Sequence, residues 1–253
     1  TGIDINELER ALASHQVSAC WLMSNFHNPT GASIPDIDRP RIVSLLAAYQ
    51  VPLIEDDVYG ELYFSSSRPM PLKVHDTQGG VLHCGSFSKQ LAPGFRVGWI
   101  AAGCYAMQIE KRQSVSSLAV GAPNQLAIAD YLKQGGYDAH LRRLRETLSA
   151  RQNRVLTQLN AILPASTWIS APKGGYFLWV ILDKKVDTRE LFHALRPFGV
   201  TIAPGALFAT DGRFNHCFRL NISTKHNDAV CDGLNQIARS LSSLFAAPPV
   251  PVK

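Results

Sequence analysis

A chain of 253 residues in which 46% are hydrophobic is long enough to bury a substantial core, in one large domain or two smaller ones. Its net charge of +5 and isoelectric point near 9.0 suit anionic ligands. The sequence shows no apolar stretch of membrane-spanning length, no signal-peptide pattern at its start and only five widely spaced cysteines, so we expect a cytoplasmic protein with no membrane partner.

Short apolar runs alternate with amphipathic stretches in the first half of the chain, which predicts an α/β fold with a mainly parallel sheet. The predicted strands are residues 19–24, 52–55, 81–85 and 97–102. A helix is predicted to begin near Asp38, a residue suited to the N-cap, with Pro40 in its first turn. In such sheets ligands bind beyond the carboxyl ends of the strands, so polar residues there are candidate site residues.

The second half changes character after a long helical stretch. Residues 121–163 are predicted to be helical with an interruption at Gly135-Gly136, and strands at 175–182 and 217–223 and helices at 187–195 and 228–245 follow. We therefore predict a large domain over residues 1–140, a linking helix with a small α+β domain over 141–245, and a disordered proline-rich tail over 246–253.

The densest group of basic residues falls on this helical stretch. No aromatic residues interleave with the group and no DNA-reading motif accompanies it, which favours a solvated helix face over a nucleic-acid surface. The group comprises Lys133, Arg142, Arg143, Arg145, Arg151 and Arg154.

Four polar or glycine-containing segments follow or precede the predicted strands within about seventy residues. A lone S-x-x-K arises by chance in many chains, and a lysine at a strand end is more often solvated than catalytic, so the argument depends on the set. The segments are Asn28-Pro29-Thr30-Gly31, Glu55-Asp56-Asp57-Val58-Tyr59, Ser86-Phe87-Ser88-Lys89 and Gly94-Phe95-Arg96-Val97-Gly98-Trp99, and the second half adds Pro172-Lys173-Gly174-Gly175-Tyr176-Phe177 and Phe218-Arg219-Leu220-Asn221.

In this order and spacing the segments resemble the class I aminotransferases, which are fold-type I enzymes that use pyridoxal 5′-phosphate. The resemblance covers nearly the whole chain except the proline-rich tail. It implies a large domain that is incomplete at its N-terminal side, because the family's phosphate loop and the aromatic residue that stacks on the cofactor ring would precede residue 1. We therefore expect this chain to bind the cofactor weakly or not at all by itself.

Within the family, residues 85–99 and 135–145 look most like the MocR subgroup of GntR-type transcription regulators. In those proteins a winged helix-turn-helix precedes an aminotransferase-like domain. The resemblance implies an effector-sensing and dimerisation domain that binds a small-molecule amine or amino acid, forms a homodimer, and reaches DNA only through an N-terminal domain absent from this chain. A free-standing aminotransferase that transfers an amino group between an amino acid and a 2-oxo acid is the alternative.

The resemblance also implies a role for individual residues. Lys89 would hold the cofactor as a Schiff base and move a proton as general base and acid. Asp56, three residues before Tyr59, would face the pyridine nitrogen and favour its protonated form. Asn28 and Tyr59 would bind the phenolic oxygen. Taken alone, Asp56 would be read as a turn or N-cap residue and Asn28 as a turn residue before proline.

The cofactor phosphate needs hydrogen-bond donors and positive charge. The resemblance implies Ser86 and Arg96 for this role, with Ser88 as a further candidate. Arg219 lies in an otherwise apolar strand, where a guanidinium needs a partner. The resemblance implies that it binds the substrate carboxylate, and a structural salt bridge is the other interpretation.

Two other reaction classes have less support. Ser86 and Lys89 followed by Lys173-Gly174-Gly175 suggest a serine acyl-transferase, but no S-x-N motif lies between them and Pro93 and Gly94 would break the helix required. The eight histidines show no metal-ligand spacing, so no metal is predicted.

Overall fold

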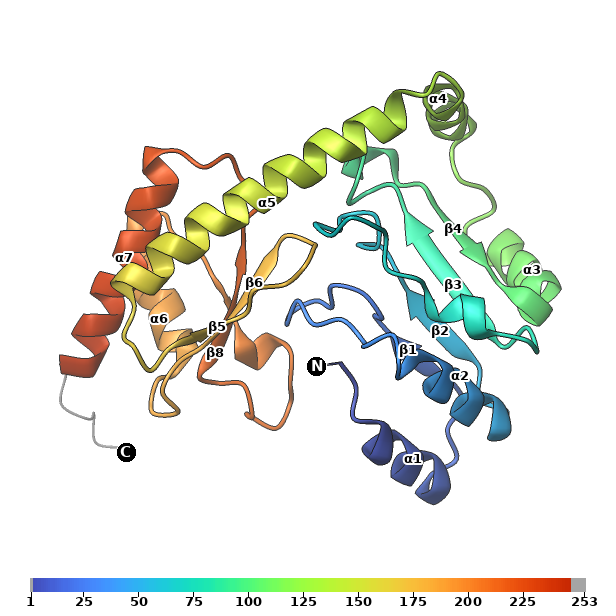
Figure 1. Cartoon of the computed structure of the whole chain (residues 1–253), viewed down its shortest axis with the longest axis horizontal. Helices are drawn as coiled ribbons and strands as arrows, with labels where there is room; N and C mark the ends of the chain where they lie inside the picture. The colour runs from blue at the N-terminus through green and yellow to red at the C-terminus, as the bar shows by residue number, and fades with distance from the viewer. Residues whose placement is uncertain (1, 247–253) are drawn as a thin grey trace. The chain divides into compact units, whose positions relative to one another are not determined.

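The computed structural model describes residues 2–246, which form two compact units (Figure 1). The N-terminal unit comprises residues 2–28, 32–146 and 173–175, and the C-terminal unit comprises residues 29–31, 147–172 and 176–246. Each unit includes a short segment that is flanked in the sequence by residues of the other unit. Residues 29–31 belong to the C-terminal unit, and residues 173–175 belong to the N-terminal unit. Residues 247–253 of the predicted disordered tail lie outside the described part of the chain.

A four-stranded sheet forms the centre of the N-terminal unit. Its strands are β1 (Cys20–Leu22), β2 (Leu53–Asp56), β3 (Val81–Ser86) and β4 (Gly98–Ala101), in that order across the sheet. The first three strands are parallel and β4 runs antiparallel to β3. The α/β fold and the mainly parallel sheet are thus confirmed, although the direction of β4 was not predicted.

Helices and short 3-10 turns accompany this sheet. The helices are α1 (Ile5–Ser14), α2 (Arg39–Ala48), α3 (Ala106–Ser116) and α4 (Ala122–Lys133), and the 3-10 turns are η1 (Leu72–His75), η2 (Pro93–Phe95) and η3 (Gly103–Tyr105). Apolar residues of α1 and α2 form one buried cluster with residues of β2 and β3. Asp38 occupies the N-cap position of α2, but its side chain makes no capping hydrogen bond, so the predicted cap is only positional.

The long helix α5 (Gly136–Ile162) begins in the N-terminal unit and continues into the C-terminal unit. With 27 residues it is about 40 Å long. Gly135 separates it from α4 in the left-handed conformation, with φ at +73°, which glycine adopts without strain. The predicted interruption at Gly135-Gly136 is therefore confirmed as the boundary between two helices.

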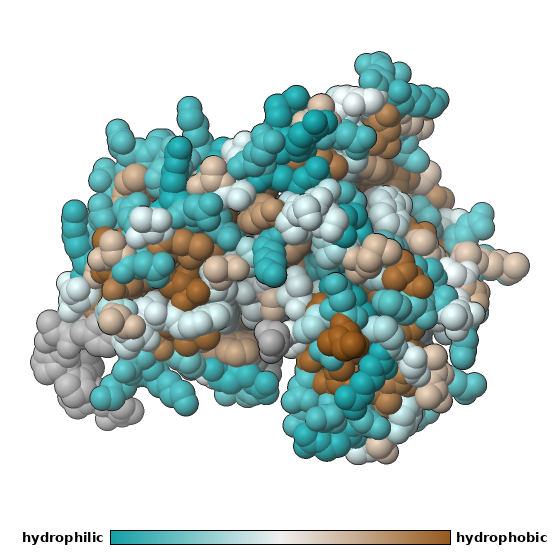
Figure 2. All heavy atoms as spheres, in the orientation of Figure 1, coloured by the Kyte–Doolittle hydropathy of each residue, from teal (hydrophilic) through white to brown (hydrophobic). Residues whose placement is uncertain are grey.

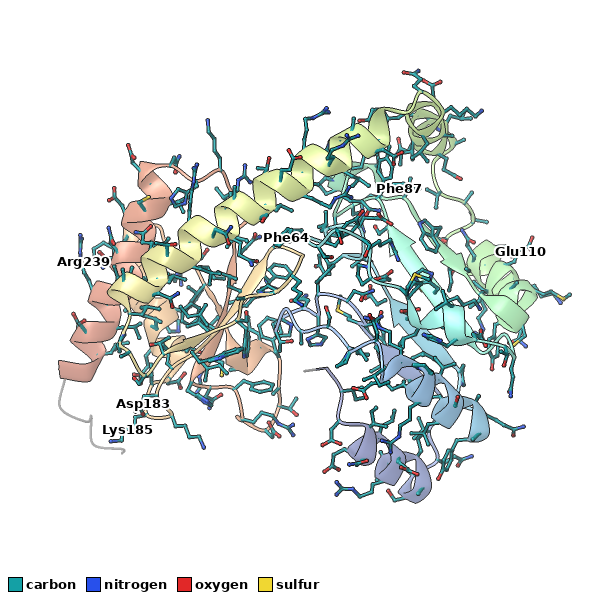
Figure 3. The ribbon with its side chains drawn as sticks, in the orientation of Figure 1. Phe64, Phe87, Glu110, Asp183, Lys185 and Arg239 are labelled. Atoms are coloured by element: carbon teal, nitrogen blue, oxygen red, sulfur yellow. The ribbon has the colours of Figure 1, made fainter. Side chains whose placement is uncertain are left out.

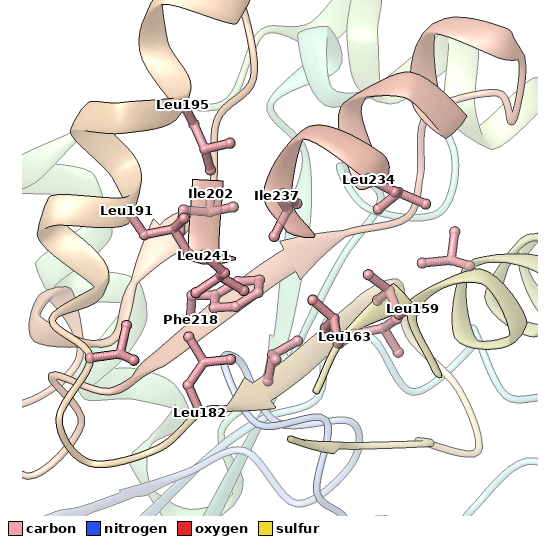
Figure 4. Packing of buried hydrophobic residues seen from close by; sticks show 14 of the residues in the cluster. Leu159, Leu163, Leu182, Leu191, Leu195, Ile202, Phe218, Leu234, Ile237 and Leu241 are labelled. Atoms are coloured by element: carbon pink, nitrogen blue, oxygen red, sulfur yellow. The ribbon is translucent and has the colours of Figure 1, made fainter. Parts of the chain in front are cut away.

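The C-terminal unit contains a second, antiparallel sheet with its own helices. Its elements are β5 (Trp168–Ile169), β6 (Phe177–Ile181), α6 (Thr188–Leu195), η4 (Arg196–Phe198), β7 (Ala203–Pro204), η5 (Gly205–Leu207), β8 (Cys217–Asn221) and α7 (Asp228–Ala246), and the strand order is β5-β6-β8-β7. Apolar residues from α5, α6, α7 and the central strands form one continuous core around Phe218 (Figure 4). This agrees with the small α+β unit predicted from the sequence.

Candidate functional site

The segments that contain Asp56, Ser86 to Lys89 and Arg96 lie at one edge of the N-terminal sheet. In the parallel register Leu22 pairs with Glu55 and Asp56 pairs with Cys84, so the carboxyl ends of β1, β2 and β3 lie at the same edge. Because β4 is antiparallel, its first residue, Gly98, pairs with Ser86. The segment containing Arg96 therefore reaches the same edge from the opposite direction.

Asp56 and Lys89 lie within electrostatic reach of each other at this edge. Asp56 is half-buried as the last residue of β2, and Lys89 is exposed in the turn after β3. Burial raises the pKa of Asp56, whereas hydrogen bonds from the Val58 amide and from Trp21 and the positive charge of Lys89 lower it; the net shift is upward. The structure thus places an amine within electrostatic range of a carboxylate where β2 and β3 end.

Trp21 is a site neighbour that the sequence analysis missed. Its indole N–H, the only donor of that side chain, donates a hydrogen bond to Asp56, although the residue is 70% exposed. The available signal was a tryptophan in the short strand β1, whose neighbours in the strand are less exposed. That pattern alone does not say which residue the indole contacts.

Ser86, Ser88 and Arg96 form a short chain of hydrogen bonds. The Ser88 amide donates to Oγ of Ser86 at 3.1 Å, and a terminal nitrogen of Arg96 donates to Oγ of Ser88 at 3.2 Å. Arg96 has φ at +54°, in the left-handed region that non-glycine residues adopt at a cost. Its guanidinium and two hydroxyl groups are therefore collected beyond β3, an arrangement suited to an anion.

The arrangement required by the serine acyl-transferase interpretation is not formed. Ser86 is the last residue of β3, so it does not share a helix with Lys89. Lys89 lies instead in a tight turn, in which the amides of Leu91 and Ala92 both donate to the carbonyl oxygen of Phe87. The Phe87 ring, which is labelled in Figure 3, contacts Tyr137 edge to face, with 6.2 Å between the ring centroids.

Asn28 and Tyr59 follow the first two strands at the same edge. Tyr59 is buried, with 4% of its surface exposed, and Asn28 is half-buried. The loop before Asn28 contains Phe26, which is buried with φ at +51°. A Cβ atom on Gly174 would lie 2.6 Å from the Leu62 carbonyl oxygen and would also collide with the Phe26 ring. Glycine is thus required where residues 173–175 pack on this loop.

Asp57 holds the turn between Asp56 and Tyr59 in place. Its carboxylate accepts hydrogen bonds from Asn25 at 2.8 Å and from Arg68 at 2.7 Å, and it pairs with Nε2 of His83 at 3.1 Å. Burial alone would raise the pKa of Asp57, but the hydrogen bond from His83 and the charge of Arg68 bring it below the usual value. These contacts give Asp57 a structural role in the turn.

Arg219 belongs to the C-terminal unit. It lies in β8, where the guanidinium carbon is 4.2 Å from the centroid of the Phe177 ring and 5.3 Å from that of Phe208. Two aromatic faces therefore hold the cation by cation–π contacts. The planar guanidinium is suited to bidentate binding of a carboxylate.

Neither a membrane segment nor a metal cluster is found among residues 2–246. None of their helices combines the length and the apolar character that crossing a bilayer requires. None of the histidine, cysteine, aspartate and glutamate side chains in this part of the chain gather in groups of three or more that could hold a metal ion.

The model of the family described as aminotransferase class I and II matches residues 1–236. The chain belongs to this family. HTH-type transcriptional regulator YdcR of Escherichia coli (strain K12) is 44% identical over 238 residues, which are 94% of this chain and 51% of the relative. The 2-aminoadipate transaminase of Thermus thermophilus is 30% identical over 250 residues, 97% of this chain and 62% of the relative.

Solved aminotransferases share the fold. The structure of LysN, an α-aminoadipate aminotransferase from Thermus thermophilus complexed with N-(5′-phosphopyridoxyl)-L-leucine, superimposes with a TM-score of 0.89 at 30% identity over 96% of this chain and 63% of that protein. This aminotransferase-family chain thus has the fold of the fold-type I enzymes, as predicted. It spans about half the length of the HTH-type regulators it matches.

Proposed function

We propose that the N-terminal unit binds pyridoxal 5′-phosphate at the sheet edge where β1, β2 and β3 end. The observation that carries this proposal is that the Asp56 carboxylate lies within electrostatic range of the Lys89 amine, where β2 and β3 end. When bound, the cofactor supplies an aldehyde that condenses with amines and a pyridine ring that accepts electrons. The residues present fit such a group, because an amine, a carboxylate and a guanidinium with two hydroxyl groups lie at one edge.

Asp56 and Lys89 would perform the proton chemistry. Asp56 holds a proton at the ring nitrogen, and the hydrogen bond from Trp21 orients its carboxylate. Lys89 provides the anchoring amine, and its Nζ atom takes a proton from the α-carbon of an amino acid and returns it. The exposed turn that contains Lys89 leaves room for a substrate amine to displace it.

The remaining candidates would bind and orient. Arg96, Ser86 and Ser88 bind the phosphate, in line with the chain of hydrogen bonds that joins them. Asn28 and Tyr59 donate to the phenolic oxygen of the ring. For Arg219, in the C-terminal unit, we propose that the guanidinium binds an amino-acid carboxylate, for which its aromatic neighbours hold it in place.

At the level of the whole protein, we propose the effector-sensing and dimerisation domain of a MocR-type transcription regulator in the cytoplasm. The support is the similarity to HTH-type regulators, of which YdcR is 44% identical, and the half-length coverage of those relatives. DNA would be contacted through a separate N-terminal domain, and a small amine or amino acid would be the effector. All five cysteines carry free thiols, which suits a reducing compartment.

Borohydride reduction tests the proposed anchor without relying on turnover. The full-length protein is mixed with pyridoxal 5′-phosphate, reduced and digested, and mass spectrometry locates the cofactor. We expect modification at Lys89 in the wild type and its loss in Lys89→Ala, whereas Lys111→Ala, which removes an exposed lysine of α3, keeps it. Modification that persists in Lys89→Ala, or that falls mainly on another lysine, would show that the anchor is assigned wrongly.

A free-standing aminotransferase is the second candidate, favoured by the 30% identity to a 2-aminoadipate transaminase. The full-length protein loaded with the cofactor distinguishes the two. A transaminase releases a 2-oxo acid in many turnovers when an amino acid and an acceptor oxo acid are added, and a regulator binds an operator fragment with an affinity that the amino acid changes. Repeated turnover without DNA binding would overturn the regulator proposal.

A further inference from the structure

The C-terminal unit contains a pocket that has no part in the proposed cofactor site. Its volume is about 250 Å³, and every residue that lines it belongs to this unit. Its walls are formed by α5, β8, α7 and the loop before β7. Apolar side chains of Val155, Val200, Leu220, Leu234 and Ile237 make up much of the lining. The pocket therefore opens onto the apolar core of the unit, to which Val155, Leu234 and Ile237 also belong.

A guanidinium, from Arg151, and an imidazole, from His226, are among the side chains that line the same pocket. Arg151 of α5 is half-buried and donates a hydrogen bond to the Ser223 carbonyl oxygen. Within residues 2–246 no carboxylate pairs with it. His226 has its Nε2 atom 3.3 Å from Sγ of Cys231, and its buried Nδ1 atom has no hydrogen-bond partner in the described chain. The guanidinium of Arg151 and the imidazole of His226 therefore each retain hydrogen-bonding groups that no described residue binds.

The lining indicates the chemistry of an occupant. A guanidinium without a carboxylate partner favours an anion, and its planar fork matches a carboxylate. The apolar walls favour a compact aliphatic body over a polar one, and the volume is below that of pockets for drug-sized ligands. Asp228 and Asp232, the acidic residues of α7, do not line the pocket and form no ion pair with Arg151.

Apolar surface interrupts the polar surface over α7 and the C-terminal half of α5 (Figure 2). We propose that the pocket is a second binding site, which takes a small monocarboxylate with a branched aliphatic body, and that Arg151 binds its carboxylate. The aliphatic body contacts Val155, Val200 and Leu234. This site goes beyond the proposed cofactor function and does not depend on it, because all its residues lie in the C-terminal unit.

A larger residue at position 233 would fill the pocket without removing any side-chain contact, because Gly233 has no side chain. It lies inside α7 and lines the pocket, and a Cβ atom on it would meet Cγ2 of Val200 at 3.6 Å, an ordinary contact distance. Glycine is a poor helix former, so Gly233→Leu should strengthen the helix while its side chain fills the cavity. Ser243→Leu adds the same side chain at an exposed position of the same helix and is the matched control.

The experiment titrates the whole 253-residue chain with 4-methylpentanoate and follows valine and leucine methyl signals by NMR. We expect the signals of Val155, Val200 and Leu234 to shift saturably, and the neutral 4-methylpentanamide to bind about tenfold more weakly, since it lacks the charge that Arg151 binds. Arg151→Gln should weaken the acid by about tenfold, while Arg154→Gln, at an exposed position of α5, should change its affinity less than about twofold.

Gly233→Leu should abolish the shifts and Ser243→Leu should keep them, with thermal unfolding confirming that both variants fold. The proposal is overturned if these methyl signals do not move up to the solubility limit of the acid. It is equally overturned if the amide binds as tightly as the acid, or if Gly233→Leu binds like the wild type. None of these results bears on the cofactor site, whose test is the modification of Lys89.

Discussion

Different interactions stabilise the interiors of the two units of this chain. In the C-terminal unit the central strand β6 has four of its five residues buried, and two of them, Leu178 and Val180, join one continuous apolar core. In the N-terminal unit all four residues of β4 are exposed and α3 has no buried residue. There the edge that carries the candidate site is held by buried polar groups such as Asp57 and Glu55. Each unit therefore has an apolar core, but in the N-terminal unit hydrogen-bonded charges position the candidate site at the sheet edge.

The largest expected effect comes from the apolar core of the C-terminal unit. Phe218 is completely buried there, so Phe218→Ala should lower the free energy of unfolding by about 4 kcal/mol. The four tryptophans divide equally, with Trp21 and Trp99 in the N-terminal unit and Trp168 and Trp179 in the other. When Phe218→Ala with fluorine-labelled tryptophans is unfolded in urea, the signals of Trp168 and Trp179 should change at lower urea concentrations than those of Trp21 and Trp99. Equal shifts of all four signals would show that the units unfold together.

The polar network predicts a smaller effect that depends on pH. Asp57→Asn removes a buried charge bound by Arg68 and His83, and it should cost about 3 kcal/mol near neutral pH. Because the pKa of Asp57 is lowered in the folded protein, its contribution is present above the ordinary carboxyl pKa of about 4 and is lost as the pH falls through the folded value. Urea midpoints of wild type and variant should converge in acid. A constant difference at all pH values would contradict this account.

A matched pair of threonine substitutions compares the buried central strand β6 with the exposed edge strand β4. Val180→Thr places a hydroxyl group at a completely buried position of β6 and should cost about 2 kcal/mol. Ile100→Thr, in β4, changes a residue that is 39% exposed and should cost less than about 0.5 kcal/mol in this chain. Chemical denaturation measures both. If the two costs were equal, the contrast in burial between β6 and β4 would have no energetic meaning.

The smallest expected effect is the difference between alanine substitutions at the N-caps of α6 and α2. Asp187 accepts a hydrogen bond from the Arg189 amide at the start of α6, so Asp187→Ala should cost about 1 kcal/mol. Asp38 makes no such bond at the start of α2, and Asp38→Ala should change the unfolding free energy by less than about 0.5 kcal/mol. Thermal unfolding of the two variants under identical conditions checks the difference. A larger loss from Asp38→Ala would show that this carboxylate stabilises α2 by another route.

The local sequence pattern predicted most of the helices and strands, but it did not predict all of them or the direction of every strand. The predicted strand at 81–85 corresponds to β3, and the glycine pair at 135–136 lies where α4 gives way to α5. The antiparallel direction of β4 could not be predicted, because an apolar run has the same pattern in either direction. The helices α1 and α3 were not among the predicted elements.

The candidate site, too, was predicted only in part from the sequence. The order of its motifs identified the family and named Asp56, Lys89 and Arg96 as candidates, since each chemical role requires a particular residue type at a particular strand end. Their hydrogen bonds and charge interactions depend on chain segments far apart in sequence. The Trp21 contact with Asp56 joins two neighbouring strands, and the three groups that bind Asp57 come from three separate segments.

The sequence by itself therefore determined the fold class, the family and the residue types available for chemistry, because these follow from local periodicity and from motifs that lie along the chain. Only the tertiary structure decided which of those residues share an edge, which charges are buried and where a second pocket opens. The physical reason is that burial and electrostatic interaction depend on distance in space, which sequence spacing does not specify.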